Sequence, residues 1–114
     1  MKAKVKNKQI IISEKVKVAS SLTSRVLGLM FKKNLSENES LLIEPCNSIH
    51  TCFMNFAIDV VFISKDNVVI HVIENMRPWK FSSIYFKSKK VLELKGGTLK
   101  NKILKGDQLE FENV

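Results

Sequence analysis

The side chains most able to do chemistry are concentrated in one short stretch, from Cys46 to Asn55. It reads CNSIHTCFMN and holds both cysteines and one of the two histidines of the chain. If this stretch forms a β-strand, His50, Cys52 and Met54 share one face, because side chains alternate along a strand. Residues two apart on one face are about 7 Å apart at Cα, so His50 and Cys52 could interact through their side chains.

Three interpretations of this stretch stay open. A metal site would use Cys46, His50 and Cys52, because sulfur and imidazole ligands suit zinc or copper, although the chain has no Cys-x-x-Cys pair. A hydrolase or transferase would use Cys52 or Cys46 as a nucleophile paired with His50. The structural interpretation, which we favour, makes the cysteines small buried side chains and His50 a hydrogen-bonded one.

Asp59 is a further candidate, because it lies in the apolar run FAIDVVF. A carboxylate there is costly unless it is paired or hydrogen-bonded. It is either a catalytic acid, base or ligand in a pocket or, as we favour, a structural acceptor for backbone N–H groups or for Arg25. We expect Arg25 and Asp59 to form a pair that docks a helix on the sheet. The alternative is that Asp59 faces a pocket where Arg25 holds an anionic ligand.

Trp79 follows a proline in a predicted loop, where it either caps the core, as we favour, or closes a groove. That groove would be lined by residues 50–59. The candidate binding residues are Arg25, His50, Met54, Asp59 and Trp79.

The sequence contains no P-loop, Gly-x-Ser-x-Gly, His-Glu-x-x-His or EF-hand motif. Without a complete catalytic constellation, we expect a non-enzymatic binding or accessory module without a cofactor. The Cys/His enzyme and the Cys/His metal-binding domain remain the alternatives.

The composition fits one small basic domain spanning residues 1–114, of which 45% are hydrophobic. The net charge is +8, but only Arg25 and Arg77 are arginines, and the basic residues are spread from Lys2 to Lys105. Phosphate recognition favours arginine forks or clustered charge, so we do not expect a nucleic-acid site. We expect a monomer whose partner is a small molecule or a protein.

The N-terminal sequence MKAKVK is interrupted by lysines, and no run approaches the roughly 20 apolar residues of a membrane span. We therefore expect no signal peptide, no membrane span and a cytoplasmic location. In a reducing cytoplasm Cys46 and Cys52 should be free thiols.

Many short apolar stretches separated by turn residues predict a mainly β fold, as a small antiparallel β-sandwich or barrel. Leu22, Val26 and Leu29 recur at helical spacing and predict one short helix over residues 20–30 that ends near Gly28. A hairpin is expected between residues 9–12 and 16–18. The other predicted strands cover residues 41–43, 49–53, 58–63, 68–73, 81–86, 91–94 and 108–111.

Several of these segments also form an ordered series of motifs: RVLGLMF from Arg25, LLI from Leu41, IHTCFMNFAIDVVF from Ile49, PWK from Pro78, VLELKGG from Val91, and Gly106-Asp107. Together they resemble the prokaryotic family called domain of unknown function 192. The resemblance runs from about residue 25 to residue 111 and implies a compact β-rich sandwich or barrel with a short helix. It implies no settled activity, and many members of the family carry an export or lipid signal.

The sequence departs from the family pattern at three positions. Ala57 stands where proline is usual, Lys80 where arginine is common after Pro-Trp, and Ser40 where a glycine usually precedes the apolar strand. These changes affect backbone geometry more than chemistry.

Overall fold

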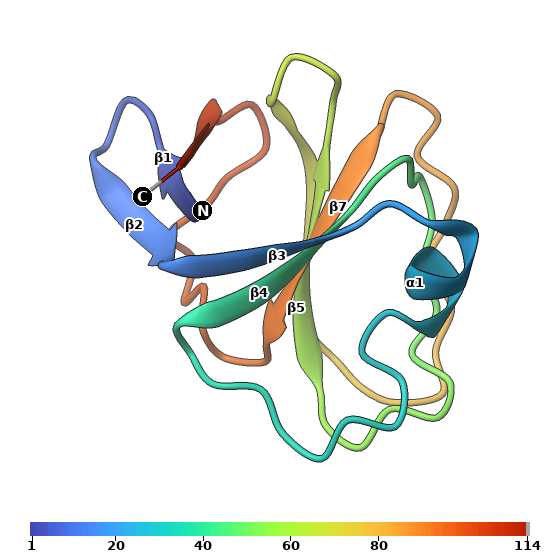
Figure 1. The fold of residues 1–114 in the computed structure, drawn as a ribbon. Helices are drawn as coiled ribbons and strands as arrows, with labels where there is room; N and C mark the ends of the chain where they lie inside the picture. Colours follow the sequence, from blue (N-terminus) through green and yellow to red (C-terminus); the bar gives the residue numbers. More distant parts are fainter. Residues whose placement is uncertain (114) are drawn as a thin grey trace.

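Two open β-sheets and one short helix make up the fold (Figure 1). The structure is a computed structural model, and it describes residues 1–113. In chain order, the elements are β1 (Lys2–Val5), β2 (Ile10–Ser13), β3 (Lys15–Ala19), α1 (Leu22–Leu27), β4 (Glu39–Ile43), β5 (Ile58–Ile63), β6 (Val69–Met76), β7 (Lys90–Lys95) and β8 (Leu109–Glu112).

The smaller sheet has the strand order β2-β1-β8, and the larger sheet has the order β3-β4-β7-β5-β6. Paired strands run antiparallel except β3 and β4, which run parallel. The prediction of a mainly β domain with one short helix is confirmed, and the described strands form two open sheets rather than a closed barrel. The described residues contain no helix that is long and apolar enough to cross a membrane.

The predicted hairpin between residues 9–12 and 16–18 is wrong. Its strands, β2 and β3, belong to different sheets: β2 pairs with β1, and β3 continues into the larger sheet beside β4. The change of sheet is fixed at Glu14 and Lys15, whose backbone N–H groups both donate to the carbonyl of Asn38. A period of two shows which residues are in strands, but it does not show which strands pair.

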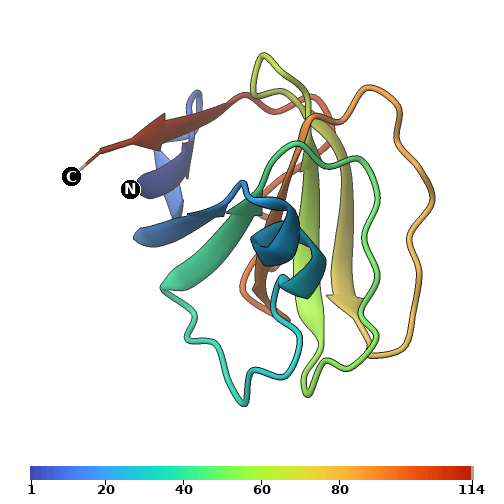
Figure 2. The ribbon, with the colours of Figure 1, turned by 45° about the vertical axis from the view of Figure 1, so that its right-hand side comes forward.

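The predicted strands at residues 49–53 and 81–86 are also absent. These segments are loops that meet in a single bridge between His50 and Phe81. Figure 2 shows both as long loops on the side of the larger sheet that lies away from the smaller one. Phe53 has φ of 64°, in the left-handed region and far from the extended backbone of a regular strand, so the first segment does not continue as a regular strand.

The helix α1 is shorter than the predicted 20–30 and is bounded by clear caps. The Ser21 side chain accepts a hydrogen bond from the backbone N–H of Ser24, and the Ser24 side chain caps Ser21 in return. The predicted apolar helix face is not buried: Leu22 is 70% exposed and Val26 58% exposed. Only Leu29, which follows the helix, is buried, at 1% exposure.

The core has two parts, one on each face of the larger sheet. The part between the two sheets includes Val5, Val61, Leu92 and Leu109. The part on the opposite face includes Leu29, Ile43, Val60, Phe62 and Met76. Because both faces of β5 and β7 are covered, these strands read as nearly continuous apolar runs.

Asp59 is the buried acceptor that holds the loops at one end of β5. Its side chain is fully buried, and its Oδ1 accepts hydrogen bonds from the backbone N–H groups of Asn75 at 2.9 Å and Gly97 at 3.2 Å. Its Oδ2 accepts one from the N–H of Leu99 at 2.9 Å. The backbone, not Arg25, therefore satisfies this carboxylate.

We expect Asp59→Ala to destabilise the fold by on the order of 3 kcal/mol or more, because it leaves buried N–H groups without acceptors. Asp66→Ala, which removes an exposed carboxylate from a turn, is the matched control and should change stability by less than about 0.5 kcal/mol. Urea denaturation measures both. Equal midpoints for the two variants would contradict the assigned role.

Candidate functional site

A pocket of about 300 Å³ lies on the face of the larger sheet that α1 covers. Its walls come from the sheet, from α1 with the turn that follows it, and from the loop after β4. Its lining residues are Arg25, Val26, Leu27, Gly28, Met30, Ile43, Cys46, Ser48, Ile49, His50, Met54 and Glu93. Most of this lining is apolar, and two of the lining side chains, Arg25 and Glu93, ordinarily carry charge.

Glu93 lies at the centre of β7, paired with Leu41 on one side and with Val60 on the other. Its side chain is only 2% exposed, and burial raises the pKa of its carboxyl to about 8. The Oε1 atom is buried and has no hydrogen-bond partner among the described residues. At neutral pH the carboxyl is therefore mostly protonated and can donate a hydrogen bond.

Sequence reasoning missed Glu93, although the signal was present. The residue stands between Leu92 and Leu94 in an apolar strand, which is the pattern that identified Asp59. An isolated carboxylate in an apolar run marks either a structural acceptor or a site residue, and the pattern alone does not distinguish these roles.

Arg25 enters the pocket from the last turn of α1. One of its terminal nitrogens, Nη1, donates a hydrogen bond to the carbonyl of Pro45 at 3.3 Å, and its buried Nε has no partner within residues 1–113. The predicted pair of Arg25 with Asp59 is wrong: among residues 1–113 no ion pair joins them, and Asp59 is bound by backbone N–H groups. The two residues act at separate places because they belong to opposite faces of the larger sheet.

Gly28 ends α1 beside Glu93. Its φ of 48° and ψ of −123° are strained for any residue with a side chain. A Cβ atom at Gly28 would lie 3.4 Å from Glu93 Oε1 and 3.9 Å from Ile43 Cδ1. The glycine therefore lets the chain turn closely over the carboxyl while leaving the pocket open.

The loop that carries His50 is held by Thr51, which is fully buried. The Thr51 hydroxyl donates to the carbonyl of Arg77 at 2.6 Å and accepts from the backbone N–H of Lys80 at 2.9 Å. Two backbone bonds reinforce this contact, from Thr51 to Lys80 and from Trp79 to Thr51. Thr51 thus fixes the position of His50 without itself lining the pocket.

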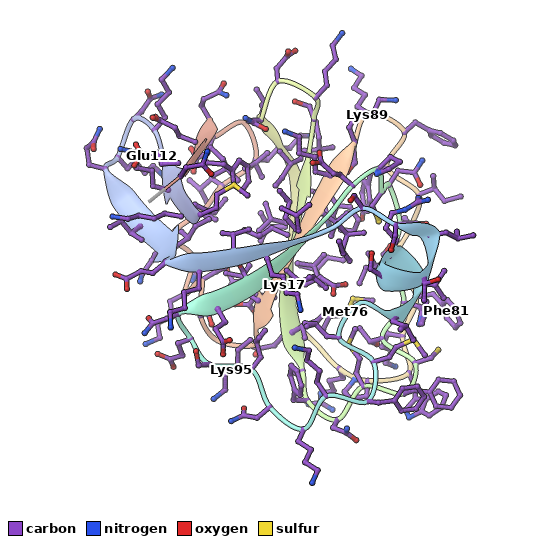
Figure 3. The ribbon with its side chains drawn as sticks, viewed as in Figure 1. Lys17, Met76, Phe81, Lys89, Lys95 and Glu112 are labelled. Atoms are coloured by element: carbon purple, nitrogen blue, oxygen red, sulfur yellow. The ribbon has the colours of Figure 1, made fainter. Side chains whose placement is uncertain are left out.

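His50 accepts a hydrogen bond at Nδ1 from the backbone N–H of Cys52, at 3.1 Å. In the neutral ring this leaves Nε2 as the N–H donor, a tautomer that the hydrogen bond assigns. The ring lies 6.2 Å from that of Phe81, which projects outward on the same side of the molecule as α1 (Figure 3). Because His50 lines the pocket, its Nε2–H is a candidate donor to a ligand there.

Cys46 lies close to both charged residues of the pocket. Its thiol donates to the carbonyl of Ser48 at 3.1 Å, and burial raises its pKa. A negative charge on Glu93 acts in the same direction, whereas the positive charge of Arg25 lowers this pKa. The thiol is protonated at neutral pH, which disfavours the interpretation of Cys46 as a nucleophile.

The structure brings some of the predicted residues together and separates others. Arg25, His50 and Met54 line the pocket, together with Cys46. Cys52, Asp59 and Trp79 lie outside its lining, so neither Asp59 nor Trp79 forms the predicted groove. Both cysteines are free thiols, as predicted.

No three side chains of His, Cys, Asp or Glu among residues 1–113 gather as a metal site would require. Cys46, His50 and Cys52 are accordingly not brought together. His71, the second histidine, stacks on Tyr85 with ring centroids 4.6 Å apart.

The fold is that of a class of small two-sheet β domains already seen in crystals. A protein of unknown function from Novosphingobium aromaticivorans DSM 12444 has a similar fold, with a TM-score of 0.76, 22% identity, and coverage of 84% of this chain and 74% of that one. A Sinorhizobium meliloti 1021 protein described as a "putative transcription regulator" has a TM-score of 0.72, 25% identity, and coverage of 83% and 79%.

Within this class, the chain belongs to the DUF192 family, described as Uncharacterized ACR, whose model matches residues 2–111. This confirms the resemblance seen in the sequence motifs. A UPF0127 protein of Pyrococcus furiosus is 30% identical over 115 residues, which cover 96% of this chain and 95% of that protein. Neither the description of the family nor that of the Pyrococcus furiosus protein gives an activity.

We expect Glu93→Gln to gain stability relative to the parent protein as pH rises. The folded protein holds the Glu93 proton up to a pKa of about 8, whereas the unfolded chain releases it near 4.5. Between these values the folded state binds more protons, so raising the pH destabilises the parent, by on the order of a few kcal/mol once the pH exceeds 8. Glutamine does not titrate. The other titratable groups are the same in both proteins, so their contributions to the free energy of unfolding cancel in the difference.

Urea denaturation of both proteins from pH 4.5 to 9 measures this difference. Above pH 8 the difference should level off, because Glu93 is then ionised in both states. A difference that stays constant across the range would contradict a buried, protonated Glu93.

We also expect the Cys46 thiol to titrate above its ordinary pKa of 9.0. The rate of alkylation by iodoacetamide in a Cys52→Ser variant reports Cys46 alone, because the chain has two cysteines. Adding Arg25→Met should move the midpoint further upward, since the Arg25 charge lowers this pKa. A midpoint below the ordinary value would restore the nucleophile interpretation.

Proposed function

We propose that this protein is a non-enzymatic binding module for a small organic acid, with the acid group held between Arg25 and Glu93 in the pocket beside α1. The observation that carries this proposal is the pair of buried polar atoms, Arg25 Nε and Glu93 Oε1, that lack partners in one pocket. Buried polar groups without partners are costly, and a ligand that bonds to them removes that cost.

An anionic group matches the charge of the pocket better than a cationic one. Arg25 is permanently charged, and at neutral pH the Glu93 carboxyl is mostly protonated, so the pair carries a net positive charge. The available groups are donors: the Arg25 guanidinium, the Glu93 hydroxyl and His50 Nε2. A carboxylate accepts from all three kinds of donor, whereas an amine would face the arginine.

The remainder of the ligand would be small and apolar. The pocket volume of about 300 Å³ is at the lower end of the range for small-molecule sites. Besides Arg25 and Glu93, the lining offers the apolar side chains of Met30, Ile43, Ile49 and Met54. Methionine side chains adapt to ligands of different shape, so the pocket suits a set of related acids.

Binding rather than catalysis is supported by the state of the Cys/His pair. The Cys46 thiol is protonated and used as a donor, and His50 Nδ1 is occupied by the backbone N–H of Cys52. Neither group is poised to activate the other. The cytoplasmic location and the monomeric state stay predictions, which cell fractionation and sedimentation test.

We expect short-chain monocarboxylic acids with four to six carbons to raise the Tm of the protein at pH 6.5, and the matched amides and amines to leave it unchanged. Mass action makes the shift grow with ligand concentration. Raising the pH to 9 should weaken binding, because an ionised Glu93 loses its hydroxyl donor and repels the acid.

Arg25→Met should abolish the response to the acids, because it removes the cation and keeps an apolar side chain in place. Lys17→Met is the matched control, since it removes one positive charge from an exposed position on β3 (Figure 3). An equal response in both variants, or stabilisation by the amines instead of the acids, would overturn the proposal.

A further inference from the structure

Three aromatic side chains form a cluster on the surface, outside the pocket. Phe31, Phe53 and Trp79 are 62%, 49% and 60% exposed. The ring centroids of Phe31 and Phe53 are 5.5 Å apart, and those of Phe53 and Trp79 are 4.7 Å apart in an edge-on contact. These three residues, called the aromatic patch below, come from three separate loops and leave a contiguous apolar surface exposed.

The backbone at all three positions is strained. Phe31, Phe53 and Trp79 have φ values of 63°, 64° and 66°, in the left-handed region that bulky residues rarely adopt. The strain is held by hydrogen bonds from the N–H of Phe31 to the carbonyl of Phe53 and from the N–H of Trp79 to the carbonyl of Thr51. Strained positions that do not bury their side chains are typical of functional surfaces.

The loop segments that carry the aromatic patch contribute charge of one sign. These segments, residues 29–34, 51–56 and 77–82, contain Lys32, Lys33, Arg77 and Lys80 and no Asp or Glu. All four basic residues are exposed. The aromatic patch therefore has four basic neighbours in its own segments, with Glu39 of β4 close to one of them, Lys32. A partner that fits it supplies both apolar contact and negative charge.

The ring geometry favours a membrane surface over single-stranded nucleic acid. Nucleic-acid bases stack on open ring faces, one base to each ring. Here the rings pack against one another, edge-on and tilted, so they form one compact apolar cluster. Tryptophan and lysine are also the residues that favour the interface of a bilayer with anionic lipids.

We propose that the aromatic patch docks this protein on the surface of a bilayer that contains anionic lipids. The rings of Phe31, Phe53 and Trp79 enter the headgroup region, while Lys32, Lys33 and Lys80 contact lipid phosphates. Docking is peripheral and reversible, and it uses no residue of the pocket. It is therefore independent of the proposed binding of an organic acid.

Trp79 provides a direct test, because it is the single tryptophan of the chain. With vesicles of phosphatidylglycerol and phosphatidylcholine in equal amounts, the Trp79 emission should shift to shorter wavelength and the protein should sediment with the vesicles. Vesicles of phosphatidylcholine alone should bind much more weakly, and 0.5 M salt should weaken binding to the anionic vesicles.

Two variants remove the proposed contacts and keep Trp79: Phe31→Ala, and Lys32→Gln combined with Lys33→Gln. Each should weaken binding by about tenfold or more, from lost apolar insertion or lost phosphate contacts. The controls, Phe86→Ala and Lys87→Gln combined with Lys89→Gln, change exposed residues near the other end of the loop that carries Trp79, and they should bind like the parent. Circular dichroism verifies that all variants fold.

Absence of sedimentation and of an emission shift with the anionic vesicles would overturn the proposal. Equal losses in the patch variants and the controls would also overturn it, because they would indicate attraction by overall charge. Quenching of Trp79 by a short single-stranded DNA, without a response to vesicles, would assign the patch to nucleic acid instead.

Discussion

The central strands β5 and β7 are covered on both faces, so a carboxylate in either of them must be hydrogen-bonded or protonated. Each strand holds one such residue, and the two meet this constraint in opposite ways. Asp59 accepts three backbone N–H bonds on the face toward the smaller sheet. Glu93 faces α1, where burial raises its pKa to about 8. One carboxylate fixes loops, and the other gives the pocket its polar centre.

The sequence predicted the strands that can be recognised from their own apolar residues, without knowing which strands they pair with. Apolar runs bounded by turn residues identified β4, β5, β6, β7 and β8 close to their observed bounds. It did not predict β1, where lysines alternate with small apolar residues, or the parallel pairing of β3 with β4, which depends on partners distant in the chain. The β-branched and aromatic residues of 49–53 favour a strand locally, but the hydrogen bonds of Thr51 hold them in a loop.

The candidate site, like the fold, was predicted only in part from the sequence. Arg25, His50 and Met54 were predicted as binding residues, and all three line the pocket. Residue type and motif identified them even though the strand predicted at residues 49–53 is a loop. The predicted pairing of Arg25 with Asp59 was not correct. Predicting such a pair requires knowing which face of the sheet each residue occupies, and Asp59 and Glu93 lie on opposite faces. The sequence marks both as unusual, and only the strand register separates the structural carboxylate from the pocket one.

The pocket and the aromatic patch are both connected to one buried residue, Thr51. Its neighbour His50 lines the pocket, and its backbone carbonyl holds Trp79 in the strained conformation of the patch. These loops are held by a few hydrogen bonds between side chain and backbone, and by a single β-bridge, rather than by an extended strand ladder. Segments held in this way open more easily than a sheet and commonly carry function. The larger sheet, which is covered on both faces, thus supports the loops around Thr51. These loops contribute residues to both the pocket and the aromatic patch.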